Sequence, residues 1–269
     1  MPMNVFIFGL AAIALYLTVA VKTSEIARAA PSSYAPRPST AALAFTALVA
    51  HALALYPMMV TVEGINLGIF SAASLVAWLV AGITIIATLR APVASLAVVI
   101  LPFSAVIVAV SLLFTDQRLV QQLPIALALH IGLSLIAYSL FAIAALQALY
   151  LNFAQRRLKS HTPVLRFLPP LATMEQLMFQ LTGIAFVLLS LGLVVGVPLI
   201  EDVRAQHLGH KIVFSALAWV TFAVLLLGRY QWHWRGRRAV KFLIAGFVLL
   251  ALGFFGSKFV LELVLHRPS

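Results

Sequence analysis

The chain has 269 residues, of which 63% are hydrophobic and only 9% are charged. A mean hydropathy of +1.09 excludes a soluble globular domain, because such a domain needs a far more polar surface. The absence of cysteine excludes disulfides, thiolate metal sites, iron–sulfur clusters and thiol redox chemistry within the chain. The net charge of +11 comes from short basic tracts between apolar runs, a pattern that does not favour nucleic-acid binding.

Apolar runs long enough to cross a bilayer recur along the whole chain. A membrane-spanning helix needs about 20 mostly apolar residues. We therefore expect an all-α, polytopic bundle of eight helices that forms one integral membrane domain over residues 1–269. The fifth span is long enough to tilt or to extend beyond the bilayer. The predicted spans are residues 3–22, 40–58, 66–89, 92–114, 124–154, 176–199, 210–228 and 239–264.

The distribution of Lys and Arg indicates how the chain is oriented in the membrane. The loops after the first, third, fifth and seventh spans contain 13 of the 18 Lys and Arg residues, and the opposite side contains five. The positive-inside rule places the more basic loops in the cytoplasm. We therefore expect both termini outside, an N-out and C-out topology.

In this orientation five of the seven histidines fall on the outer side: His51, His130, His207, His210 and His266. An ionisable side chain within a span is costly and is a functional candidate by default. Imidazole is also a common ligand of metals and of haem iron. His130 and His51 lie deepest in their spans and are the first candidates as iron ligands, followed by His210. His207 and His266 are weaker candidates.

Other polar residues are candidates to assist such a site. Ser134 and Tyr138 follow His130 at the i+4 and i+8 positions, where they share a helix face and could orient the imidazole or meet a haem propionate. Arg204 and Lys211 at the outer rim could pair with propionates. For each of these residues the alternative is ordinary helix packing or a polar tip that reaches the interface.

No constellation of residues predicts catalysis. The chain contains no Gly-rich phosphate loop, no HExxH zinc motif and no hydrolase triad, so we do not expect an enzyme. Thr173 and Gln176 predict a capping box at the start of the sixth helix. Trp232 and Trp234, in the basic segment RYQWHWRGRR, are typical of an interfacial aromatic belt.

Several stretches carry a family resemblance. HIGLSLIAYSLFAIAALQALYL at 130–151 resembles the cytochrome c assembly family, the haem-handling membrane proteins of the CcsA and CcmC type. Three more stretches resemble its smaller YpjD-type inner-membrane branch, and the resemblance covers about residues 45–264. They are LPPLATMEQLMFQLTGIAFVLLSLGLVVG at 168–196, HKIVFSALAWVTFAVLLLGRY at 210–230 and WRGRRAVKFLIAGFVLLALGFFGSKFVLEL at 234–263.

The resemblance implies a bacterial inner (plasma) membrane protein that holds haem b at the outer face and assists cytochrome c assembly. Its implied partners are haem, other cytochrome c assembly proteins or apocytochrome c, and the lipid bilayer. His130 matches the family's first external histidine, and His51 resembles the histidine of an early span in the YpjD-type branch. The segment GVPLIEDVRAQHLG at 196–209 lacks the family's Trp-x-Trp-Asp element, so the ligand set does not carry over whole.

Two other classes of function compete with haem handling. A transporter of a small molecule or ion would use the intramembrane histidines as a proton or substrate relay. A membrane scaffold would bind a partner protein without haem, for example through the basic RGRR loop at 235–238. The residues alone support haem handling and transport almost equally, and the family resemblance favours haem.

Overall fold

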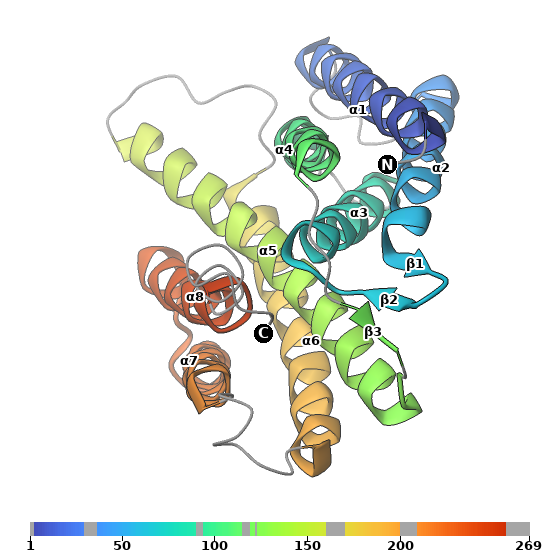
Figure 1. The fold of residues 1–269 in the computed structure, drawn as a ribbon. Coiled ribbons are helices and arrows are strands. Elements are labelled where there is room, and N and C mark those ends of the chain that lie inside the picture. Colours follow the sequence, from blue (N-terminus) through green and yellow to red (C-terminus); the bar gives the residue numbers. More distant parts are fainter. Residues whose placement is uncertain are drawn as a thin grey trace. The chain divides into compact units, whose positions relative to one another are not determined.

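The computed structural model describes residues 3–29, 37–89, 94–114, 119–121, 123–159, 170–199 and 209–256 (Figure 1). The chain divides into two compact units. Unit 1 is Met1–Gln122 with Leu165–Pro169, and unit 2 is Leu123–Val164 with Pro170–Ser269. Within the described ranges, eight helices are long and apolar enough to cross a membrane. The expected all-α polytopic architecture is therefore confirmed.

Unit 1 consists of four helices and a small antiparallel sheet. Large apolar side chains lie on the outer surface of this unit; for example, Phe45 is 66% exposed and Phe103 is 64% exposed. Such faces suit a lipid environment, since water would disfavour so much exposed apolar surface. The elements are α1 (Met3–Ala29), α2 (Pro38–Met59), β1 (Val60–Thr61), β2 (Gly64–Asn66), α3 (Ile69–Thr88), α4 (Ala94–Leu113) and β3 (Leu119–Val120).

The sheet of unit 1 was not expected from the sequence. β1 and β2 form a hairpin that pairs Thr61 with Gly64, and β2 pairs with β3 through Ile65 and Val120. Gly64 has a φ of 143° and packs so closely that an added Cβ would lie 2.6 Å from the carbonyl oxygen of Val120. Only glycine fits this turn, because it has neither the φ restriction nor the Cβ.

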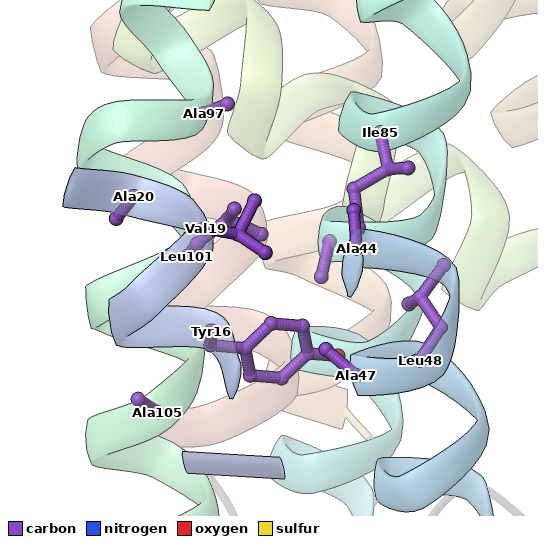
Figure 2. Packing of buried hydrophobic residues seen from close by; sticks show 11 residues of the cluster. Tyr16, Val19, Ala20, Ala44, Ala47, Leu48, Ile85, Ala97, Leu101 and Ala105 are labelled. Carbon is purple, nitrogen blue, oxygen red and sulfur yellow. The ribbon is translucent and has the colours of Figure 1, made fainter. Parts of the chain in front are cut away.

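The core of unit 1 is built mainly from small side chains. Alanines from α1, α2, α3 and α4 line it, and Figure 2 shows the ring of Tyr16 on α1 directed towards Ala47 on α2. Small residues let membrane helices approach closely, which maximises van der Waals contact. The buried members are Tyr16, Val19, Ala20, Ala44, Ala47, Leu48, Ala81, Ile85, Ala97, Leu101 and Ala105.

Unit 2 contains the other four long helices. Its fifth span is 34 residues long, as the length of the apolar run predicted. A π-helical turn ends the last helix, a feature that is often found at functional sites. The elements are α5 (Ile125–Lys159), α6 (Leu171–Gly196), a 3₁₀ turn (Val197–Leu199), α7 (Gly209–Trp232), α8 (Gly236–Ala251) and the π-helix (Leu252–Gly256).

A stacked aromatic pair forms the centre of unit 2. The rings of Phe141 on α5 and Phe222 on α7 lie 3.8 Å apart with an interplanar angle of 11°, and both are fully buried. Gly246 on α8 makes room for Phe222, because a Cβ there would lie 2.7 Å from the Phe222 ring. The Phe141–Phe222 stack joins α5 to α7, and the contact of the Phe222 ring with the backbone at Gly246 joins α7 to α8.

One detail of the sequence-based boundaries differs from the structure. Helix α6 begins at Leu171 directly after Pro170 and has no side-chain cap hydrogen bond, so the capping box predicted for Thr173 and Gln176 is wrong. Because the helix starts at Leu171, Thr173 lies inside its first turn and cannot serve as the N-cap residue of a capping box. The end of the last predicted span, residues 257–264, lies outside the described residues.

The turn between α7 and α8 is held by a carboxylate from α6. Glu175 Oε1 accepts a hydrogen bond from the Gly236 backbone N–H at 3.1 Å and lies 3.8 Å from the Arg229 guanidinium. Arg229 also donates to the Trp234 carbonyl oxygen at 3.3 Å and lies over the ring of Phe179, 4.6 Å from its centroid. The Glu175 carboxylate on α6 therefore contacts the end of α7 through Arg229 and the start of α8 through Gly236.

Replacing Glu175 by alanine is expected to loosen this turn. The loss of one charged hydrogen bond and one partly exposed ion pair should lower stability by about 1 to 2 kcal/mol. The thermal unfolding midpoint in detergent measures this. Glu25→Ala removes an exposed carboxylate on α1 and serves as the matched control. Equal midpoints for the two variants would contradict the assigned role of Glu175.

Candidate functional site

His130 lies near the start of α5, where it contacts the end of α6. Its Nδ1 is 2.7 Å from the carbonyl oxygen of Gly192. A carbonyl oxygen only accepts, so Nδ1 carries the hydrogen of this bond. Within the described residues no hydrogen bond engages Nε2. The half-buried imidazole is thus held through Nδ1, and Nε2 has no partner among the described residues.

Two glycines on α6 admit the polar side chains of α5. A Cβ on Gly196 would lie 2.6 Å from both Cε1 and Nδ1 of His130, and a Cβ on Gly192 would lie 3.3 Å from Ser134 Oγ. The pair on α5 is spaced i, i+4, and so is the pair on α6, so two matching turns face each other. This is the small-xxx-small arrangement that allows membrane helices to pack closely.

Tyr138 has different neighbours from His130 and Ser134. Its ring packs against Phe247 on α8 and against Phe254 and Phe255 in the π-helix, with centroid distances of 5.4, 5.9 and 5.5 Å. The predicted stripe of three residues therefore divides: its first two members contact α6, and the third contacts α8. In the described structure Tyr138 makes no hydrogen bond to His130.

His51 is buried at the centre of unit 1 and is only 1% exposed. Its Nδ1 shares a hydrogen bond with the Tyr16 hydroxyl at 3.1 Å, and its Nε2 shares one with Ser74 Oγ at 3.0 Å. Ser111 on α4 donates to Ser74 Oγ at 3.5 Å. These four side chains come one each from α1, α2, α3 and α4, and they link all four helices of unit 1.

The two histidines differ in how they suit iron. A ligating imidazole normally donates one N–H to a carbonyl and offers the other nitrogen to the metal, which is the arrangement at His130. Both nitrogens of His51 have protein partners, so ligation by His51 requires one of these hydrogen bonds to break. Among the described residues there is no cluster of three or more His, Asp or Glu side chains able to hold a metal. A haem iron needs only two axial ligands from the protein.

The remaining predicted site residues are only partly described. His210 is the second residue of α7, but its side chain lies outside the described residues, as do His207, His266 and Arg204. Lys211 follows in the first turn of α7 and is half-buried. Sequence reasoning missed the two α6 glycines, although the motif GLVVG at 192–196 carries the small-xxx-small signal.

Comparison with known proteins gives consistent matches over most of the chain. The cytochrome c assembly protein family matches residues 40–265. The inner membrane protein YpjD of Escherichia coli strain K12 is 34% identical over 225 residues, which cover 82% of this chain and 86% of that protein. An uncharacterized 28.8 kDa protein of Azospirillum brasilense is 34% identical over 141 residues, which cover 51% of this chain and 52% of that protein.

A more distant relative has a descriptive name. The cytochrome c biogenesis protein CcsA of Guillardia theta is 25% identical over 188 residues, which cover 60% of this chain and 62% of that protein. No solved structure gives a significant match.

Proposed function

Because the chain belongs to the cytochrome c assembly family, we propose that it binds haem through His130 near the outer face of the membrane. Family membership supports a role in cytochrome c biogenesis. The eight apolar helices, and the match to an inner membrane protein over most of its length, make the chain a multi-pass inner membrane protein.

The observation that carries the proposal is the state of the His130 ring. Its Nδ1 is held by the Gly192 carbonyl oxygen, and no described residue binds Nε2. Nε2 would therefore be the atom of this imidazole that binds a haem iron. When bound, haem would supply an iron centre that can be oxidised and reduced. The protein's part is to hold and orient it.

The second axial ligand is proposed from topology. Odd-numbered spans start on the same side of the membrane, so the starts of α5 and α7 share a side. Because the more basic loops follow the odd-numbered spans, on the opposite side, we propose that the starts of α5 and α7 lie outside. His210 at the start of α7 belongs to the same unit as His130 and is the first choice. His51 is not proposed as the partner of His130, because both nitrogens of its imidazole already have hydrogen-bond partners. Lys211 and Arg204, near the same start of α7, are proposed to pair with the propionates.

The proposed role in the cell is to present or retain haem b for apocytochrome c, together with other assembly proteins. A strain that lacks this protein is expected to contain less covalently bound haem in its c-type cytochromes. Haem staining of membrane proteins after denaturing electrophoresis measures this, with b-type cytochrome spectra as the control. Restoration by the wild-type gene and by His233→Asn, but not by His130→Ala, would support the proposal. Unchanged c-type cytochromes in the deletion strain would refute it.

A further inference from the structure

The end of α6 is shaped around the imidazole of His130. The ring lies directly on the α6 backbone at Gly196, where an added Cβ would lie 2.6 Å from two ring atoms, well inside van der Waals contact. One of those atoms is Nδ1, which is 2.7 Å from the Gly192 carbonyl oxygen, and the other is Cε1, the carbon between the two ring nitrogens. Because Gly196 has no side chain, the His130 ring can reach the Gly192 carbonyl, which lies one turn earlier in α6.

The carbonyl that receives the hydrogen bond lies near the end of a helix. Gly192 is the fifth residue from the end of α6, so its carbonyl oxygen already accepts the helical hydrogen bond of the Gly196 N–H and has a second lone pair for the imidazole N–H. A carbonyl in this region, on a face without side chains, is accessible to an imidazole N–H from a neighbouring helix.

We propose that Gly196 is a positioning residue for His130: it seats the ring so that Gly192 selects the Nδ1–H tautomer and leaves Nε2 as the iron-binding atom. The role towards iron rests on the proposed haem function. A hydrogen bond at Nδ1 orients a ligating imidazole and strengthens its electron donation, and loss of such a partner typically weakens metal affinity about 10- to 100-fold. Any side chain at position 196 displaces the ring and separates Nδ1 from the carbonyl.

The tautomer is measurable without haem. In haem-free protein carrying ¹⁵N-labelled histidine, nitrogen NMR distinguishes a protonated ring nitrogen from an unprotonated one, and the spectrum of His130→Asn identifies the His130 signals. The wild type is expected to show Nδ1 protonated and Nε2 unprotonated. Gly196→Ala is expected to lose this single state. Gly183→Ala on the same helix is the matched control, because a Cβ there meets no atom within 4 Å; its spectrum should equal that of the wild type.

A second readout uses haem. Gly196→Ala is expected to bind haem about tenfold more weakly than the wild type and to raise the reduction potential, whereas Gly183→Ala changes neither. An Nε2–H tautomer in a wild type that binds haem would overturn the positioning role and leave the proposed function standing. An Nδ1–H tautomer in a wild type that takes up no haem would support the seating of the ring and overturn the haem function. Equal tautomers in the wild type and Gly196→Ala would overturn the role of Gly196.

Discussion

Replacing His130 by alanine is expected to reduce the haem content of the purified protein by about tenfold or more, because His130 is the proposed ligand of the iron. His130 is the predicted site residue whose Nε2 has no partner among the described residues. The ratio of haem to protein, from the pyridine haemochrome spectrum, measures the effect. His233→Asn is the matched control, since His233 is exposed and has a φ of 52°, which asparagine tolerates.

A cavity variant separates ligation from folding. His130→Gly leaves a space beside α6, and added imidazole is expected to occupy it and to restore haem binding. Rescue of this kind requires that the missing group be the imidazole itself. Haem content that is unchanged in His130→Ala, or lost and not restored by imidazole in His130→Gly, would show that the iron is held elsewhere.

The second large effect is expected at His51, on the stability of unit 1. Replacing His51 by alanine leaves the buried Tyr16 hydroxyl and Ser74 Oγ without their shared partner and opens a cavity among four helices. Unsatisfied polar groups and a cavity together should lower stability by about 3 kcal/mol, although hydrogen bonds between membrane helices contribute less than those in idealised estimates. The thermal unfolding midpoint in detergent measures the loss.

Two milder variants measure how much each hydrogen bond of His51 contributes to the stability of unit 1. Tyr16→Phe removes only the hydroxyl and its one hydrogen bond, so it should cost about 1 kcal/mol. His51→Gln keeps a polar group in reach of one partner and should fall between Tyr16→Phe and His51→Ala. If His51 acted as an iron ligand instead, His51→Ala would lose haem while its haem-free form kept the wild-type unfolding midpoint. That result would reverse the assignment of His51 as the link between the four helices.

The membrane spans were predictable because the thickness of the hydrocarbon core sets the length of a spanning helix, and that length appears in the sequence as a run of apolar residues. The long α5 helix was foreseen for the same reason. The starts of helices were harder to predict: α6 begins at Leu171, directly after Pro170, and not at the polar pattern around Thr173. The β1–β2 hairpin was missed because two- and three-residue strands carry no periodic signal.

The histidines could be selected from the sequence, but not their partners. His51 contacts Tyr16 and Ser74, which are 35 and 23 residues away along the chain, and helical periodicity says nothing about which helices meet. Periodicity also placed His130 and Tyr138 on one stripe, yet the stripe is wide enough to face two neighbours, α6 and α8. The two glycines of α6 could be read from the motif GLVVG, but their contacts with Ser134 and His130 become evident only in three dimensions.

The most direct test of haem binding is the absorption spectrum of the wild-type protein purified in detergent, oxidised and then reduced with dithionite. Haem binding through His130 predicts a Soret band and, on reduction, sharp α and β bands, either directly after purification or after reconstitution with hemin. A protein that shows no such bands even after incubation with hemin would contradict haem binding, and its histidines would then have to serve another function.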